Sequence, residues 1–151
     1  MDSIVERQRG IVTEHIRGEN DHDWPAVYDT FVQDDRAYYD VVPLGTRFKG
    51  IEGVRSFYQA IATAMPDLHI EVTSECDVPG CSIREVVITG THKGEFACVK
   101  PLGNAIRIEM ASFMGSTQGQ ENSSQSEYIT TKRAYSGRCK ASKGPTLLSR
   151  N

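Results

Sequence analysis

The chain has 151 residues, of which 38% are hydrophobic and 25% are charged, and its formal net charge is −3. This length and composition fit a single globular domain with a core of its own. A slightly acidic chain lacks the basic surface that attracts nucleic acid or anionic membranes, so we expect neither as a partner.

The cysteines and the N-terminal residues indicate a cytoplasmic protein without a metal centre. Cys76, Cys81, Cys98 and Cys139 form no CxxC pair, and no histidines accompany them at the spacing of zinc ligands. The first residues, MDSIVERQRG, have no apolar segment behind their charges, and no run of about 18 apolar residues occurs. We therefore expect reduced thiols, no signal peptide, no membrane span and no metal or organic cofactor.

The beginning of the chain has the pattern of a helical hairpin. Apolar residues recur at helical spacing from residue 3 to about residue 17, and His15 stands at the edge of this buried stripe. The polar stretch 18–23 is predicted to break that helix. One of its aspartates can cap a second, short helix that carries Trp24 and Phe31.

A strand and a third helix follow. Residues 36–42 look extended, and Pro43-Leu44-Gly45 has the composition of a turn. After Gly50, apolar residues at i, i+3, i+4, i+7 and i+11 give the strongest helical pattern of the chain, which Pro66 ends. These residues are Val54, Phe57, Tyr58, Ile61 and Met65.

The rest of the chain has the alternating period of strands. Predicted strands cover residues 69–75, 82–96 and 104–114, with a weaker one at 127–135. Three helices followed by a run of antiparallel strands indicate an α+β domain whose helices cover one face of the sheet.

Two segments depart from this pattern. Residues 115–126 contain no apolar residue, which predicts a polar loop inserted between the last two strands. Residues 137–151 contain four basic residues and no acid, so we expect a poorly ordered basic tail. The single domain is therefore predicted to span residues 1–136.

Several motifs follow one another in an informative order: GENDHDWPAVYDTF, then DDRAYYDVVPLG and FKGIEGVRSFY, then PDLHIEV, then GTHKGEF with a Pro-x-Gly turn after it. In this order they resemble the SnoaL-like polyketide cyclase and ketosteroid-isomerase-related group of the nuclear transport factor 2-like superfamily. The resemblance implies a cone-shaped, cystatin-like fold, in which a strongly curved antiparallel sheet wraps around three N-terminal helices and leaves an apolar pocket at its open end. It also implies a homodimer formed through the outer face of the sheet.

The resemblance draws attention to Asp40 as a catalytic base. Ketosteroid isomerases carry their base on the first strand, and their DD-x-x-x-x-D-P pattern is similar to Asp34-Asp35 followed by Asp40. A carboxylate among apolar side chains can have its pKa raised into the range of a general base. Tyr38 shares a strand face with Asp40 and could orient it. The alternative is that Asp40 hydrogen-bonds backbone amides of the turn that leads to Pro43.

Other catalytic positions of the related enzymes are changed in this chain. The resemblance places the isomerase tyrosine position at His15 and the protonated acid position at Ala111 or Ser112, so the usual pair of donors to an enolate is incomplete. For SnoaL-type cyclases, the aspartate position falls on Ala134 and the histidine position on Ser112. We therefore expect neither steroid isomerisation nor aldol-type ring closure, and His15 could equally be a structural helix histidine.

These observations predict a pocket for a small hydrophobic molecule, cyclic or polyketide-like. One hypothesis is an isomerase- or lyase-like proton transfer with Asp40 as base and His15 as its polar partner. The other is a non-catalytic ligand-binding or dimeric interaction module that has lost such activity. The predicted substrate-binding residues are Trp24, Phe31, Tyr38, Phe57, Ile61, His92, Met110 and Ser112.

Two of the motif residues have a structural alternative. His92 in GTHKGEF is either a ligand contact or a histidine that only makes structural hydrogen bonds. Cys98 stands where relatives often have glycine, and we expect it to be a small buried residue.

Overall fold

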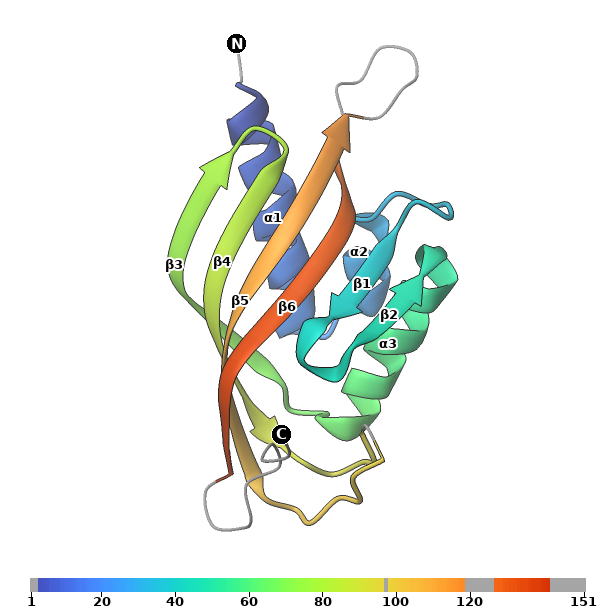
Figure 1. Cartoon of the computed structure of the whole chain (residues 1–151), viewed down its shortest axis with the longest axis vertical. Coiled ribbons are helices and arrows are strands. Elements are labelled where there is room, and N and C mark those ends of the chain that lie inside the picture. The colour runs from blue at the N-terminus through green and yellow to red at the C-terminus, as the bar shows by residue number, and fades with distance from the viewer. Residues whose placement is uncertain (1–2, 97, 119–126, 142–151) are drawn as a thin grey trace.

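Helices from the first half of the chain cover one face of a sheet, in a computed structural model that describes residues 3–96, 98–118 and 127–141 (Figure 1). The helices are α1 (Ile4–Asp21), α2 (Trp24–Asp29) and α3 (Gly50–Ala64), and a 3-10 turn forms η1 (Val42–Leu44). The strands are β1 (Tyr38–Val41), β2 (Thr46–Lys49), β3 (His69–Val78), β4 (Cys81–Thr91), β5 (Ala105–Gln118) and β6 (Glu127–Ala141). This order confirms the predicted α+β class. Within the described residues, no helix is both long and apolar enough to cross a membrane.

Helix α1 begins at a capping box and ends later than predicted. The Ser3 hydroxyl accepts a hydrogen bond from the Glu6 amide at 3.1 Å, and the Glu6 carboxylate accepts one from the Ser3 amide at 2.7 Å. The helix ends where His22 takes a left-handed conformation, with φ 56°. The predicted break after residue 17 is wrong. The additional turn carries Glu19 into the interior, where it is 3% exposed.

Gly18 lies inside α1 and allows it to pack closely against α2. A Cβ atom at Gly18 would lie 2.9 Å from Val27 Cγ2, so a larger residue would require the Val27 side chain or helix α2 to shift. Helix α2 is capped as predicted, since the Asp23 carboxylate accepts a hydrogen bond from the Ala26 amide at 3.2 Å.

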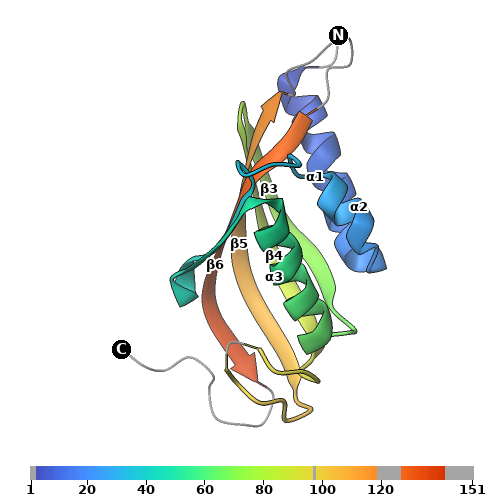
Figure 2. The ribbon, with the colours of Figure 1, turned by 90° about the vertical axis from the view of Figure 1, so that its right-hand side faces the viewer.

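The described strands form one sheet in the order β2-β1-β6-β5-β4-β3. Neighbouring strands are antiparallel, except that β1 and β6 run parallel with Tyr38 opposite Thr131. Figure 2 shows the long strands bending around α3, with the helices on the concave side. The strongly curved sheet around N-terminal helices confirms the predicted architecture. The homodimer through its outer face stays a prediction.

Two apolar clusters fill the space between the sheet and the helices. Phe57 and Tyr58, 5% and 2% exposed, come from the stripe that predicts α3. The first cluster includes the buried residues Val12, Val27, Phe31, Val54, Phe57, Tyr58, Met114 and Ile129, and the second consists of the buried residues Ala64, Met65, Leu68, Ile70, Val86 and Ile88. Partly buried side chains that pack against both clusters are Ile16, Trp24, Ile61, Phe96 and Met110. These shared contacts mark the place where a cavity opens between the clusters.

The last hairpin is longer than the sequence pattern predicts. Strand β5 continues to Gln118 instead of ending at residue 114, and β6 continues to Ala141. The predicted start of the polar loop at residue 115 and of the tail at residue 137 is therefore wrong. Polar residues can continue a strand, because a ladder of backbone hydrogen bonds does not require apolar side chains. Residues 119–126 and 142–151 lie outside the described residues, so the loop and the tail remain predictions in those ranges.

Cys98 is not the small buried residue that we expected. It is exposed and has a φ of 63°, in the left-handed region that favours glycine. It lies in a tight turn whose ends, Phe96 and Val99, exchange two backbone hydrogen bonds of 3.2 and 2.9 Å. The turn brings both of these apolar side chains to the cavity.

Candidate functional site

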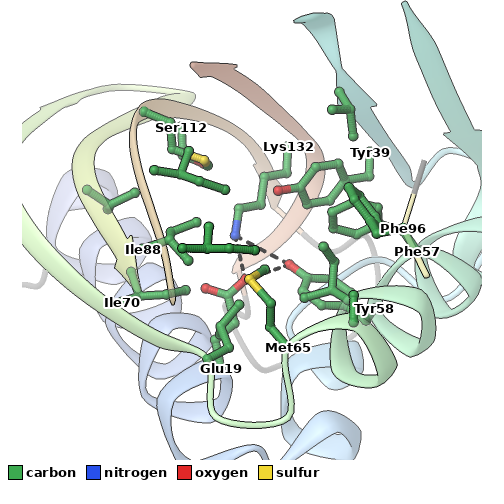
Figure 3. A pocket seen from close by; sticks show the side chains of 18 of the residues that line it. Glu19, Tyr39, Phe57, Tyr58, Met65, Ile70, Ile88, Phe96, Ser112 and Lys132 are labelled. Atoms are coloured by element: carbon green, nitrogen blue, oxygen red, sulfur yellow. Dashed lines mark hydrogen bonds and ion pairs between the residues drawn. The ribbon is translucent and has the colours of Figure 1, made fainter. Parts of the chain in front are cut away.

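A cavity of about 220 Å³ lies between the concave face of the sheet and helices α1 and α3 (Figure 3). An apolar cavity with a few polar groups is typical of a small-molecule site, and those for drug-sized ligands measure about 300–1,000 Å³. The present cavity therefore suits a small molecule. Its apolar wall includes Trp24, Phe57, Ile61, Ala64, Met65, Ile70, Val86, Ile88, Phe96, Val99, Ile106, Ile108 and Met110.

Glu19, Tyr58 and Lys132 meet at one wall of this cavity and come from α1, α3 and β6 (Figure 3). Lys132 Nζ lies 2.6 Å from Glu19 Oε1 and 3.3 Å from the Tyr58 hydroxyl, which donates to the same Glu19 oxygen at 2.8 Å. Lys132 is 4% exposed and Glu19 is 3% exposed. A charge pair buried this deeply beside a cavity marks a candidate functional site, because its desolvation is costly.

His15 and Thr30 fix the direction of the protons in this cluster. The Thr30 hydroxyl donates to a backbone carbonyl of α2 at 2.6 Å, so its oxygen accepts the Nδ1–H of His15 at 2.8 Å. Neutral His15 therefore accepts at Nε2, where Lys132 lies 3.0 Å away. The Lys132 ammonium then directs its three protons to Glu19, His15 and Tyr58.

Burial and the two charges set the protonation states of the cluster. Burial, and then the Lys132 ammonium, lower the pKa of His15, so the imidazole is neutral. Burial alone would raise the pKa of Glu19, but Lys132 and His15 outweigh it and hold this pKa well below 4.5. Burial, and then Glu19, raise the pKa of Tyr58. The cluster therefore combines one carboxylate with one ammonium and is neutral as a whole.

Three buried polar atoms on cavity-lining residues have no hydrogen-bond partner among the described residues: Glu19 Oε2, His92 Nε2 and Ser112 Oγ. Such atoms are rare, because leaving one unpaired costs about 1–3 kcal/mol. Ionised Glu19 can only accept hydrogen bonds. The three atoms therefore indicate where a ligand would make its polar contacts.

A second buried ion pair lies near the β3–β4 hairpin. Arg84, 2% exposed and on the cavity wall, donates to one Asp77 oxygen at 2.8 Å, and Arg9 donates to the other at 3.0 Å. Burial would raise the pKa of Asp77, but hydrogen bonds from Arg84, then Ser82 and Arg9, lower it to about 2. Because these charges satisfy one another, the pair supports the wall instead of offering a ligand contact.

The structure brings most of the predicted substrate-binding residues to the cavity: Trp24, Phe57, Ile61, His92, Met110 and Ser112. The prediction for Phe31 is wrong. This side chain is 0% exposed in the first apolar cluster, and its ring packs edge-on against His15 with centroids 5.4 Å apart.

Asp40 and Tyr38 lie outside the cavity. Successive residues of a strand point to opposite faces, and on β1 the inward positions belong to Tyr39 and Val41. Asp40 instead receives two hydrogen bonds from the Arg47 guanidinium, at 2.6 and 2.7 Å, and the same guanidinium stacks 4.3 Å from the Tyr38 ring centroid. The predicted places of Asp40 and Tyr38 in the pocket are therefore wrong.

His15 lies behind the cavity wall and does not line it. Its ring contacts Glu19 at 3.3 Å and the Tyr58 hydroxyl at 3.1 Å. The prediction that His15 is the polar partner of Asp40 in the pocket is therefore wrong, because its Nε2 lies beside Glu19 and Lys132.

Sequence reasoning missed Glu19 and Lys132. Glu19 stands four residues after His15, so both lie on one face of α1. A predicted helix that continued beyond residue 17 would have placed Glu19 beside His15. Lys132 gave no comparable indication, because β6 contains a bulge: Ser116 pairs with Ile129 but Gly115 pairs with Thr131. This bulge reverses the alternation between Ile129 and Lys132, so that both are buried.

The described residues contain no group of three or more His, Cys, Asp or Glu side chains that could hold a metal ion.

Comparison with known proteins identifies relatives over most of the chain. A family model described as SnoaL-like polyketide cyclase matches residues 11–134. Among curated proteins, the corresponding search found no match.

Solved structures with the same fold carry several different descriptions. A proposed SnoaL-like polyketide cyclase from Jannaschia sp. CCS1 superposes with a TM-score of 0.73 at 14% identity, over 90% of this chain and 89% of that one. A proposed aromatic ring hydroxylase from Novosphingobium aromaticivorans gives 0.72 at 18% identity, over 94% and 96%. IdmH from Streptomyces antibioticus, a proposed polyketide cyclase, gives 0.65 at 18% identity, over 85% and 90%. At these identities the matches show the fold.

Proposed function

Because the chain belongs to the SnoaL-like polyketide cyclase family, we propose that it binds a small hydrophobic, cyclic or polyketide-like molecule and transfers a proton next to a carbonyl group of that molecule. Glu19 is the base in this proposal, in place of Asp40. The observation that carries it is the free oxygen of Glu19: Oε1 accepts from Lys132 and Tyr58, whereas Oε2 has no partner among the described residues.

The charge of the site favours this reaction. When Glu19 takes a proton from carbon, the negative charge passes to the enolate oxygen of the substrate. The Lys132 ammonium, beside Glu19, then faces a new negative partner and is not left buried without one. Net charge in the cavity stays the same throughout the step.

Tyr39 is the best candidate to donate a hydrogen bond to the enolate oxygen. Its side chain lines the cavity, and in Figure 3 its hydroxyl points toward Lys132. Burial, and then the Glu19 carboxylate, raise the pKa of Tyr39 far above 10, so the hydroxyl keeps its proton. A protonated donor in a water-poor cavity stabilises developing negative charge.

One observation favours a second function, that of a non-catalytic binding protein. The low pKa of Glu19 makes its carboxylate a weak base as long as Lys132 holds it. In that case the cavity would recognise an apolar molecule through a donor group placed on Glu19 Oε2, without removing a proton from it.

Proton exchange in a simple ketone tests both functions. The probe is 2-tetralone, an apolar bicyclic ketone with acidic hydrogens next to its carbonyl. We expect the protein to speed the replacement of these hydrogens by deuterium in D₂O, followed by ¹H NMR, and Glu19→Gln to reduce this rate by about 10²–10⁴-fold. Two controls should keep the rate: Glu14→Gln, an exposed acid of the same helix, and Asp40→Asn.

Calorimetric titration with the same ketone separates the outcomes. Binding with Glu19-dependent exchange supports the enzyme. Binding with exchange no faster in the wild type than in Glu19→Gln supports the binding protein. No binding contradicts both functions for this class of ligand, and an equal loss of exchange in Asp40→Asn would contradict the assignment of the base.

A further inference from the structure

His92 lies at a different level of the cavity from Glu19. Ile88 on β4 pairs with Ile70 on β3, and the backbone of Ile70 is held by Asn20, the residue after Glu19. His92 follows Ile88 by four residues, which is about 13 Å along an extended strand. The ring of His92 and the carboxylate of Glu19 therefore mark two separate positions along the cavity.

The backbone around His92 is fixed on both sides. Its amide donates to the Asn104 carbonyl at 2.9 Å, and its carbonyl accepts from the Gly103 amide at 3.0 Å. The next amide, that of Lys93, donates to the Ala64 carbonyl at 2.9 Å, which ties the segment to the end of α3. The ring, 5% exposed, is thus held in place by the fold.

No described protein group satisfies the ring nitrogen. His92 Nε2 is buried without a hydrogen-bond partner among the described residues, and the cavity lining includes the apolar residues Ala64, Phe96, Val99 and Ile106. A ring nitrogen points in one fixed direction, whereas the unpaired hydroxyl of Ser112 can rotate about its C–O bond. His92 is therefore the better guide to the ligand.

We propose that the substrate carries a second oxygen function, a hydroxyl or a carbonyl, which hydrogen-bonds to His92 Nε2 at a distance from its reacting end, and that His92 selects for this group. The identity of the reacting end rests on the proposed function. The recognition by His92 does not, because it concerns binding alone.

A matched pair of ligands tests this selection. The first is 2-tetralone, and the second is 6-hydroxy-2-tetralone, which adds one hydroxyl at the end of the molecule opposite its carbonyl. We expect the wild type to bind the hydroxylated ketone about tenfold more tightly in isothermal titration calorimetry, the effect of one well-made hydrogen bond in a buried site. His92→Phe should reduce this ratio to about one, and His92→Gln, which retains a hydrogen-bonding group, should keep a ratio of several-fold.

His69→Phe is the control, because His69 is an exposed residue of β3 outside the cavity wall. It should keep the tenfold ratio. The inference is overturned if the wild type binds the two ketones equally, if it binds neither, or if the ratio survives in His92→Phe. Should His92→Phe fail to fold, His92→Leu takes its place, because leucine also has no hydrogen-bonding group, and a tenfold ratio in that variant would also overturn the inference.

The deuterium exchange of 2-tetralone distinguishes the two proposals. If the affinity ratio depends on His92 while no exchange occurs, the proton-transfer function fails and the recognition by His92 stands. If exchange depends on Glu19 while the affinity ratio is one in every variant, the function stands and the recognition by His92 fails.

Discussion

Lys132 on β6 donates a hydrogen bond of 2.6 Å to Glu19 on α1, across 113 residues of sequence. Each of these side chains is buried because the other is present, since either charge alone would be costly in an apolar interior. The site therefore depends on a pair, and the two members should behave as one unit in mutagenesis.

Removing Lys132 alone should destabilise the protein strongly. In Lys132→Met the Glu19 carboxylate stays buried without its cation, and we expect a loss of about 3–5 kcal/mol in the free energy of unfolding by urea. The double variant Lys132→Met, Glu19→Gln should recover most of this loss. Additive effects of the two substitutions would contradict the coupling.

Acid should destabilise the protein in two stages. The pKa of His15 is lowered on folding, so below its ordinary value of 6.5 the unfolded chain takes up a proton that the folded protein does not. Stability should fall by up to about 1.4 kcal/mol per pH unit in this range. Below 4.5, the lowered pKa of Glu19 adds a second loss of the same sign.

Urea unfolding at a series of pH values measures both stages. His15→Gln should remove the slope that begins near pH 6.5 and keep the loss below pH 4.5, because Glu19 still has Lys132 beside it. His69→Gln, a change of an exposed histidine, should leave the first slope in place. A first slope that survives in His15→Gln would show that another group causes it.

Tyr39→Phe should slow proton transfer without weakening binding to a similar extent. Loss of a hydrogen-bond donor to the enolate oxygen is expected to reduce deuterium exchange of 2-tetralone by about 10²-fold. The dissociation constant, measured by calorimetry, should change by no more than about twofold. Tyr38→Phe is the matched control, because this neighbour lies on the opposite face of β1 and should keep the rate.

Cys98→Gly should stabilise the fold. The left-handed backbone at Cys98, with φ 63°, costs about 1–2 kcal/mol for a residue with a Cβ atom. Glycine removes this cost, but its greater freedom in the unfolded chain offsets part of the stabilisation. We expect a net gain of about 0.5–1 kcal/mol in urea unfolding. Cys98→Ser should give no gain, and a gain of the same size there would show that the thiol, not the backbone, is unfavourable.

The sequence predicts the helices and the apolar wall well, because both depend on repeated patterns. The buried face of α3 recurs over many residues, so one misjudged position changes little, and Phe57 and Ile61 line the cavity as predicted. The prediction of each polar residue of the site depends instead on assigning that one residue to the correct face of its helix or strand. The sequence pattern predicts Asp40 in the pocket, but strand periodicity alone cannot say which face of β1 is inside.

Glu19 and Lys132, which the sequence analysis did not find, illustrate the same limit. Glu19 stands in a polar stretch that resembles a linker, and its buried partners Tyr58 and Lys132 come from α3 and β6, far away in the sequence. Lys132 points inward because a bulge in β6 shifts the register by one residue. Both depend on tertiary contacts that local propensity does not describe.

The position of β6 in the sheet has a consequence for the order of assembly. It lies between β1 and β5, so the last of the described strands along the chain separates β1 and β2 from β3, β4 and β5. A nascent chain that has emerged only as far as β5 can form α1 and the β3–β4–β5 meander, but its Glu19 still lacks a cation and its cavity has an open side. The binding site should therefore be the last part of the domain to mature, through contacts of long sequence separation that form slowly.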